Sequence, residues 1–307
     1  MNNILHHLQS PIIRNNMQMT QAVRAAAQNF LQKNQFDEFN TPTLLNQNGE
    51  PYNSVFDIKI GDYSACLDDS PQIFKMFLNM AGYDKYYQFA HCFRPIEREN
   101  ETHTRLCEFT QLDIEMSVNT LAELTAFAVK LILEMCSSVN IKTDIQKMDG
   151  LFCRNNYGNE MKPNLQKDSA SASVVIIEHM PLSNGERTSE NGLIPCHHIF
   201  ALPSDELNDD NENTLINSTT ESFDIIINGI EVGGGDLRIK NSDLQRKMMN
   251  IFNVKQDKYK SYLEALDECK TTQNGGFAIG IERLIMALSG CSDIRLTVPF
   301  PDFYKNK

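Results

Sequence analysis

Residues 223–240, FDIIINGIEVGGGDLRIK, carry the strongest structural signal in the chain. A β-branched run at 225–227 is followed by Asn228 and Gly229, and a second short apolar run comes directly after them. Asn-Gly between two such runs predicts a β-hairpin, because a type I′ turn needs positive φ at both of its central residues. The stretch therefore predicts two antiparallel strands whose register is set by a two-residue turn.

The register of this hairpin places two carboxylates on one face of the sheet. A two-residue turn pairs Ile226 with Glu231, and alternation along the strand puts Asp224 on the same face. Two carboxylates in diagonal positions suit Mg²⁺, with a nucleotide phosphate completing its shell. The glycines at 233–235 let a ligand approach the backbone, and Arg238 offers a planar fork for a carboxylate or phosphate. Simple alternation turns Arg238 away from this face, so the interpretation requires a β-bulge in the glycine segment; the alternative is a hairpin with unconnected surface charges.

The overall composition restricts the class of protein. With 307 residues, 41% hydrophobic and 22% charged, the chain is long enough for one large globular domain or two small ones. Its formal net charge of −12 argues against general binding of polyanions, so any contact with nucleic acid must be local. The eight cysteines are dispersed without a Cys-x-x-Cys pair, which argues against a zinc site and favours reduced thiols in a cytoplasmic protein. We expect no signal peptide and no membrane-spanning segment.

Three arginines lie where a phosphate group can be bound. Arg94 follows a predicted strand, and Arg105 lies at the other end of a charged loop that leads to a second strand at 109–116. Two arginines that flank such a loop can clamp a polyphosphate, although a solvated loop is the alternative. Arg283 lies where a glycine-flanked strand at 275–280 passes into a helix, and from there it can reach a phosphate over the sheet.

Two further segments carry candidate binding residues. Ser70 and Pro71 are typical of a helix start, and Lys75 places a cation one turn into that helix, although a solvated surface lysine is the alternative. His197 and His198 lie in a predicted loop or short strand. Neighbouring residues on a strand point to opposite faces, so the two histidines are not expected to share a metal ion. Hydrogen bonding to a substrate is the preferred functional role for these histidines.

Several separate segments together resemble a known family. FNTPTL at 39–44, FR at 93–94 with EFTQLDIE at 108–115, and GGFAIGIERL at 275–284 resemble motifs 1, 2 and 3 of the class II aminoacyl-tRNA synthetases. SPQIFK at 70–75 and NGIEVGGG at 228–235 are similar to segments of bacterial-type aspartyl-tRNA synthetases. The resemblance implies one catalytic domain over residues 1–307, with a variable and partly polar segment at 140–222. It also implies the α+β class, with a mostly antiparallel sheet flanked by helices, and a homodimer built through the first motif.

The resemblance also implies roles for individual residues. Arg94 and Arg283 would be the catalytic residues, Lys75 and Arg238 would bind the side-chain carboxylate of L-aspartate, and Asp113 would bind its ammonium group. The implied ATP-binding residues are Arg94, Glu97, Arg105, Glu231 and Arg283. The implied aspartate-binding residues are Glu50, Ser70, Gln72, Lys75, Gln111, Asp113, His197, His198 and Arg238. The implied magnesium ligands are Asp224 and Glu231. Because a pocket for asparagine would lack the pair of cations, aspartate is favoured over asparagine.

The sequence also departs from the family pattern. Against the family pattern, we expect no anticodon-binding domain before the catalytic core and no domain inserted between motifs 2 and 3. The loop of motif 2 is longer than usual, which displaces Glu97, and Leu296 replaces an acidic residue. Asp236 stands where the family usually has serine; it can pair with Arg238, join the metal shell or face solvent, and the metal role is favoured.

Three functions are compatible with these observations. The favoured one is the activation of L-aspartate to aspartyl-adenylate with ATP and Mg²⁺, followed by transfer to a non-tRNA amine such as ammonia, as in an asparagine-synthetase-like paralogue. The second is a minimal aspartyl-tRNA synthetase that charges tRNA without an anticodon-binding domain. The third is a non-catalytic, synthetase-like regulatory binding protein, against which the intact phosphate-binding arginines and metal-binding carboxylates argue.

Overall fold

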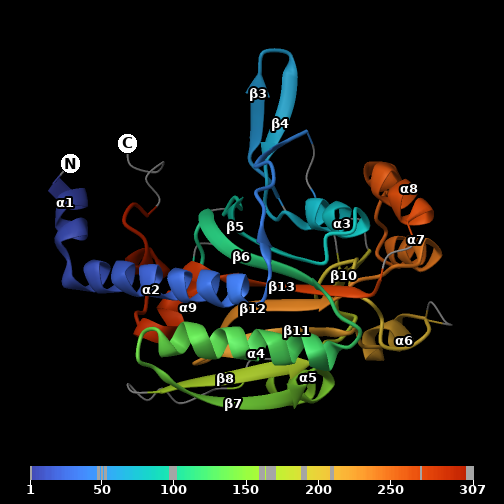
Figure 1. Cartoon of the computed structure of the whole chain (residues 1–307). Helices are drawn as coiled ribbons and strands as arrows, with labels where there is room; N and C mark the ends of the chain where they lie inside the picture. Colours follow the sequence, from blue (N-terminus) through green and yellow to red (C-terminus); the bar gives the residue numbers. More distant parts are fainter. Residues whose placement is uncertain are drawn as a thin grey trace.

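A mostly antiparallel sheet forms the centre of the computed structural model, which describes residues 2–46, 49, 51, 54–96, 102–158, 163, 171–187, 192–207, 211–269 and 272–301. Within these residues the sheet has eight strands in the order β1-β5-β6-β13-β12-β11-β8-β7 (Figure 1). In that order they are Asp37–Glu38, Lys85–Phe93, Glu108–Ser117, Asn274–Gly280, Ile230–Leu237, Ser222–Ile227, Ser171–Glu178 and Lys142–Asp149. The outer pairs β1–β5 and β7–β8 are parallel, and the pairs between them are antiparallel. The predicted α+β class with a mostly antiparallel sheet is confirmed.

One face of this sheet packs against the helices α2 (Pro11–Lys33), α4 (Leu121–Ser137) and α9 (Ile281–Ser289), of which α2 and α4 lie in front of the strands in Figure 1. Leu131 of α4 and Leu284 of α9 share one apolar core with Ile114 of β6 and Ile225 of β11. Side chains alternate along a strand, so the residues next to Ile114 point to the other face of the sheet.

The opposite face carries a second group of helices, α3 (Gln72–Met80), α7 (Ser242–Ile251) and α8 (Lys260–Glu268). They gather around one end of the sheet in Figure 1. Met76, Phe200, Met249 and Tyr262 belong to the apolar cluster that joins these helices to the segment after β10 (Leu193–Pro195). The polar face of the central strands therefore lies beside α3 and residues 196–200.

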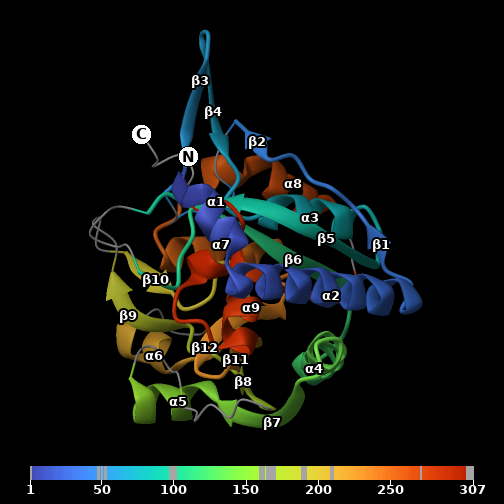
Figure 2. The ribbon, with the colours of Figure 1, turned by 90° about the vertical axis from the view of Figure 1, so that its left-hand side faces the viewer.

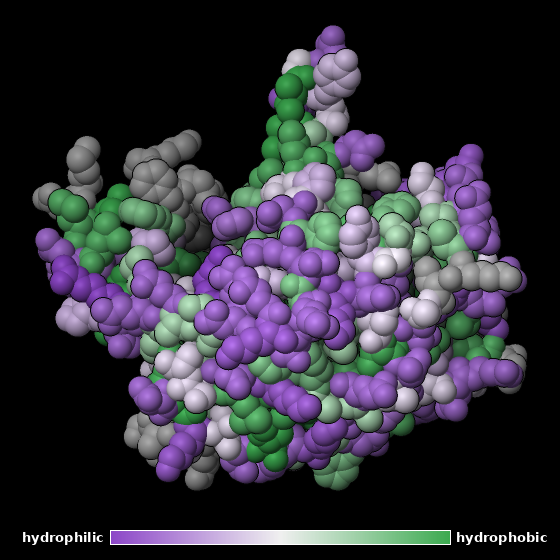
Figure 3. Space-filling view, viewed as in Figure 1, coloured by the Kyte–Doolittle hydropathy of each residue, from purple (hydrophilic) through white to green (hydrophobic). Residues whose placement is uncertain are grey.

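A hairpin of β3 (Asp57–Ile60) and β4 (Tyr63–Leu67) projects from the body of the molecule and pairs with β2 (Leu44–Leu45) (Figures 1 and 2). Figure 3 shows it standing clear of the surrounding surface. Ile60 is 50% exposed and Tyr63 is 80% exposed.

The remaining elements complete the chain. They are α1 (Asn2–Gln9), α5 (Gly150–Tyr157), β9 (Ser183–Arg187), α6 (Glu212–Asn217) and 3₁₀ helices at Gln256–Tyr259 and Ile294–Thr297. The segment 140–222, expected to be variable and partly polar, supplies β7 and β8 to the central sheet. Among the described residues, no helix has both the length and the apolar character needed to cross a membrane.

Candidate active site

The hairpin predicted from the Asn-Gly turn is formed by β11 and β12. Asn228 has a φ of 50° and Gly229 a φ of 79°, the positive values that a type I′ turn requires. Ile227 pairs with Ile230 directly beside the turn. The predicted turn and its register are therefore confirmed.

A β-bulge follows the turn in β12. Ile226 pairs with Glu231, but the next residue pair is Ile225 with Gly233, so Val232 is an extra residue on one strand. An extra residue of this kind shifts the alternation of all residues that follow it. The bulge that the sequence interpretation required is present.

The bulge brings the residues after it onto the face that carries Asp224. Asp224 pairs with Gly234, and Asp236 and Arg238 follow at intervals of two residues. A Cβ atom on Gly234 would lie 2.7 Å from Asp224 Oδ1, and one on Gly276 of β13 would lie 2.1 Å from Oε1 of Glu115 in β6. These two glycines thus provide the space that the carboxylates occupy.

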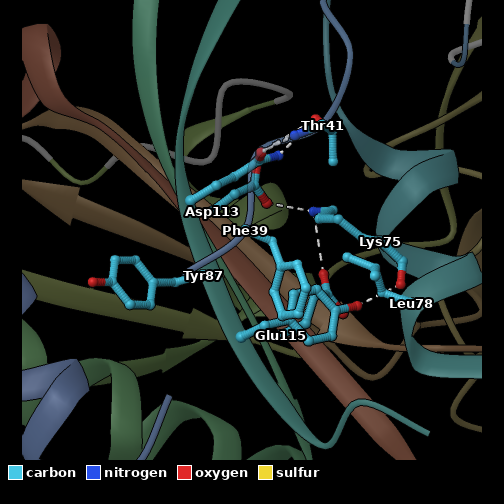
Figure 4. Close-up of a pocket in the computed structure, with 9 residues that line it drawn as sticks. Phe39, Thr41, Lys75, Leu78, Tyr87, Asp113 and Glu115 are labelled. Carbon is cyan, nitrogen blue, oxygen red and sulfur yellow. Dashed lines mark hydrogen bonds and ion pairs between the residues drawn. The ribbon is translucent and has the colours of Figure 1, made fainter. Parts of the chain in front are cut away.

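Five charged side chains form a buried cluster on this face. Lys75 Nζ lies 2.5 Å from Asp113 Oδ1 and 3.2 Å from Glu115 Oε1 (Figure 4). Arg238 binds Glu115 and Asp236, with a distance of 2.5 Å from Nη2 to Glu115 Oε1 and of 2.5 Å from Nη1 to Asp236 Oδ1. None of the five residues is more than 5% exposed. Both cations that were expected to bind a substrate carboxylate are therefore already paired with carboxylates of the protein.

Mutual contacts keep these groups ionised. Burial alone would raise the pKa of Glu115, but Arg238 and Lys75 hold it below its ordinary value. Burial would likewise raise the pKa of Asp236, and Arg238 and His198 hold it well below its usual range. Burial would lower the pKa of Lys75, but Asp113 and Glu115 raise it above its ordinary value.

The structure corrects two expectations about this cluster. Glu115 was not predicted as a site residue, although its position two residues after Asp113 on the same strand face was a usable signal. Asp236 was expected to join a metal shell, but it is fully buried and pairs with Arg238. Asp236 pairs with Arg238 because the two residues are only two positions apart on the same face of the strand.

The two histidines adopt the loop alternative of the prediction. They lie in a bend rather than a strand, so both side chains reach the same carboxylate: His198 Nε2 lies 2.9 Å and His197 Nδ1 lies 3.7 Å from Asp236 Oδ2. His197 Nε2 also lies 2.9 Å from Asp224 Oδ1. Burial would lower the pKa of His197, but hydrogen bonds to Asp224 and Asp236 raise it to about 10. The two side chains therefore point toward one carboxylate, an arrangement that a strand at these residues would not allow.

The three predicted arginines lie near one another at the other end of this face. Arg283 Nε donates to the carbonyl oxygen of Thr104 at 3.3 Å, and its Nη1 lies 3.8 Å from Glu231 Oε1. The pKa of Arg283 is lowered, mainly by burial and further by the positive charges of Arg105 and Arg94, against the opposing effect of Glu231. Such a concentration of positive charge favours an anionic ligand.

The other predicted residues are distributed as follows. Ser70 donates its backbone N–H to Asp68 Oδ1 at 3.3 Å. Gln111 accepts a hydrogen bond from the thiol of Cys92 at 3.3 Å, and Gln72 is 2% exposed. The predicted residues Glu50 and Glu97 lie outside the described residues.

The buried polar atoms near these groups that have no hydrogen-bond partner among the described residues include Asp113 Oδ2, Gln72 Nε2 and Arg94 Nε. One is an acceptor and two are donors. An unpaired buried polar atom costs about 1–3 kcal/mol, so the face presents unused hydrogen-bonding capacity of both kinds.

Known proteins share both the sequence pattern and the fold. A family model of class II tRNA synthetases (D, K and N) matches residues 1–304. An aspartate–tRNA(Asp/Asn) ligase of Borreliella burgdorferi is 24% identical over 409 residues, covering 89% of this chain and 69% of the relative. An aspartate–tRNA ligase of Lactiplantibacillus plantarum is 23% identical over 435 residues, covering 96% of this chain and 71% of the relative.

Among solved structures, an asparaginyl-tRNA synthetase from Pyrococcus horikoshii, complexed with asparaginyl-adenylate, superposes with a TM-score of 0.75. Its identity is 17%, over 97% of this chain and 70% of that one, so the likeness establishes the fold. The sequence alignments are longer than the chain of 307 residues, which means that the relatives carry residues inserted within the matched region. The match over 1–304 and the fold together confirm the prediction of a ligase-type enzyme, and the chain belongs to the class II tRNA synthetases of the D, K and N group.

Proposed function

We propose that this chain activates L-aspartate with ATP to form aspartyl-adenylate and then transfers the aspartyl group to an acceptor. The observation that carries the proposal is the set of unpaired buried atoms Asp113 Oδ2, Gln72 Nε2 and Arg94 Nε. A ligand that has both an ammonium group and anionic groups satisfies an acceptor and two donors at once. An amino acid bound beside a nucleotide phosphate is such a ligand.

The proposed first step needs positioning and charge neutralisation rather than covalent participation of the protein. An oxygen of the aspartate α-carboxylate attacks the α-phosphorus of ATP, and the bond from that phosphorus to the pyrophosphate oxygen breaks. Arg94 and Arg283 would neutralise charge on the phosphates, with Arg105 as a third cation, because these arginines lie together at one end of the face. Asp113 would hold the ammonium group, and Lys75 would lie near the side-chain carboxylate.

Asp224 and Glu231 fit a magnesium ion in their chemistry. They are carboxylates on one face of the hairpin, in the diagonal arrangement that the register with Ile226 creates, and Mg²⁺ prefers oxygen ligands of this kind. When bound there, Mg²⁺ would supply additional neutralisation of the ATP phosphates.

The acceptor in the second step is the least constrained part of the proposal. The nucleophile, an amine nitrogen or a ribose hydroxyl oxygen of tRNA, attacks the acyl carbonyl, the bond to AMP breaks, and the attacking atom loses a proton. Ammonia or another amine is the first candidate, since the net charge of −12 and the missing internal insertion disfavour a large polyanion. tRNA is the second candidate, supported by the names of the relatives, which are aspartate–tRNA ligases.

Two further features belong to the proposal. A homodimer through residues 39–44 is supported by the position of β1 at the edge of the sheet and by Leu44, which is 49% exposed. A cytoplasmic location is supported by the eight cysteines, all of which are free thiols.

The test is aspartate-dependent exchange between ATP and pyrophosphate, measured without tRNA. Arg283→Ala should lower exchange by about 10²–10³-fold, because it removes a charged contact to the reacting phosphates. Arg246→Ala is the matched control, since Arg246 lies on the surface of α7 and pairs with Asp267. Exchange at the wild-type rate in Arg283→Ala, or no exchange with any amino acid, would refute the proposal.

The acceptor is then identified from the product. Ammonia, hydroxylamine or unfractionated tRNA is added to the exchange mixture, and the aspartyl product is analysed by mass spectrometry. Asparagine or aspartyl hydroxamate at rates well above hydrolysis supports an amine acceptor, whereas aspartyl-tRNA alone supports the second candidate. A protein that binds ATP but forms neither adenylate nor product would match the regulatory alternative.

A further inference from the structure

Asp236 adds a negative charge to a pocket that already has enough carboxylates to pair its cations. Lys75 contacts Asp113 and Glu115, and Arg238 contacts Glu115. Lys75 and Arg238 are thus matched by Asp113 and Glu115 before Asp236 is counted. His197, whose pKa is raised to about 10, is a third cation, and Asp224 matches it at 2.9 Å. Asp236 is fully buried and makes its own 2.5 Å contact with Arg238, so it is a third carboxylate in the same water-excluded space.

Asp236 and Glu115 together occupy most of the hydrogen-bonding capacity of the guanidinium group. Arg238 Nη2 and Nε face Glu115 at 2.5 Å and 3.4 Å. Its Nη1 faces Asp236 at 2.5 Å and lies 3.0 Å from His198 Nε2. All three guanidinium nitrogens therefore already contact protein groups, and a substrate carboxylate must share or displace them.

The two possible side chains of a four-carbon amino acid meet this pocket differently. The carboxylate of an aspartate side chain brings two acceptor oxygens and a second excess negative charge next to Asp236. In a buried site, the two negative charges repel each other. A carboxamide brings no charge and offers an N–H₂ group that can donate to the Asp236 carboxylate while its carbonyl oxygen accepts from Lys75 or Arg238.

We propose that Asp236 determines the side-chain specificity of this pocket, by weakening binding of a carboxylate and accepting a carboxamide, so that the chain activates L-asparagine as well as L-aspartate. The inference rests on the proposed adenylation of an amino acid and names the substrates of that reaction. With serine at position 236, Arg238 would keep Glu115 as its partner and regain donors for a substrate carboxylate.

A metal ion is the other possible role of this group. One ligand atom each from His197, His198 and Asp236 lie within 4.8 Å of one another. The Arg238 guanidinium, 2.5 Å from Asp236 and 3.0 Å from His198, already occupies the cationic position beside these atoms. A divalent ion bound there would lie against the fixed positive charge of Arg238, so pairing with Arg238 explains the position of Asp236 better than metal binding does.

The test compares aspartate and asparagine in ATP–pyrophosphate exchange with the wild type, Asp236→Ser and Asp236→Asn. For the wild type, we expect kcat/KM values for the two amino acids within about tenfold of each other. Both variants should raise the aspartate-to-asparagine ratio by at least tenfold, and mainly through a lower KM for aspartate. Calorimetric titration with each amino acid, in the presence of a non-hydrolysable ATP analogue, gives the two Kd values and so measures the same preference without turnover.

The outcomes separate this inference from the proposed function. The role of Asp236 would be overturned if the wild type used aspartate with a kcat/KM more than a thousandfold above that for asparagine and both variants left this ratio unchanged. The adenylation reaction would still stand. A fall in kcat for both amino acids without a change in their ratio would also overturn it, since a merely structural role predicts that result. No exchange with either amino acid in the wild type refutes the proposed function itself.

Discussion

Replacing Glu115 with glutamine tests the buried charge cluster most directly. Glu115 is fully buried and is the shared partner of Arg238 and Lys75, at 2.5 Å and 3.2 Å. Glutamine keeps the size and much of the hydrogen bonding but removes the negative charge. Arg238 would retain Asp236 as a partner and Lys75 would retain Asp113, so both cations lose part of their compensation.

The expected loss of stability is at the lower end of the range for a broken buried pair, which is about 3–5 kcal/mol. For a chain of 307 residues the entropy of unfolding is about 0.6 kcal/mol per degree, so a loss of ~3 kcal/mol lowers the Tm by about 5 °C. Scanning calorimetry or circular dichroism at neutral pH measures this shift. Asp267→Asn, which breaks an exposed pair with Arg246, is the control and should leave the Tm unchanged within error.

The pH dependence gives a second readout of the same variant. The pKa of Glu115 is lower in the folded protein than its ordinary value near 4.5, so its contribution to stability is present above that value and is lost as the pH falls below it. Glu115→Gln should therefore differ most from the wild type at neutral pH and least in strong acid. The combined variant Glu115→Gln/Arg238→Met also removes the cation that Glu115→Gln leaves partly unpaired. Its loss of stability should therefore be smaller than the sum of the losses of the two single variants. Additive losses, or a Tm equal to that of the wild type, would refute the description of this cluster as a coupled network.

Three other predictions concern separate parts of the molecule. Lys240→Met should stabilise the protein by about 1–2 kcal/mol at pH 7, because Lys240 Nζ has no hydrogen-bond partner among the described residues and burial lowers the pKa of Lys240 to about 8. In thermal melts, this gain in stability should fade as the pH approaches 10.5. Asp224→Asn should raise the Mg²⁺ concentration needed for half-maximal exchange, and an unchanged requirement would remove Asp224 from the metal site. Sedimentation equilibrium should give twice the chain mass of 34.9 kDa, and a monomer at micromolar concentration would contradict the dimer through residues 39–44.

The parts of the fold that depend on local sequence were predictable. In β6, Leu112 and Ile114 face the helical core while Asp113 and Glu115 face the site, and this alternation is visible in the sequence as period two. The Asn-Gly turn fixed the register of its hairpin in the same way. Even the bulge could be inferred, because Arg238 reaches the face of Asp224 only if one residue is inserted.

The histidine pair shows why other parts could not be predicted. The backbone around His197 and His198 is bent by contacts with distant segments: Cys196 N–H donates to the carbonyl of Leu182, and Phe200 packs against Tyr262. A strand at these residues would have separated the two rings, whereas the bend directs both toward Asp236. Contacts of this kind depend on tertiary packing, which no local periodicity records.

The role of Asp236 depends on a row of residues that crosses three strands. Asp236 in β12 pairs with Gly276 in β13, and Gly276 pairs with Glu115 in β6. Because Gly276 has no side chain, the carboxylate of Glu115 extends across the middle strand, where a Cβ atom would lie 2.1 Å from its Oε1. The two carboxylates therefore meet the same guanidinium from neighbouring positions, and Arg238 is shared between them. The sequence alone left Asp236 with three possible roles. Its complete burial and its position two residues from Arg238 on the same strand face decide for the pairing with Arg238, and Gly276 lets Glu115 join them.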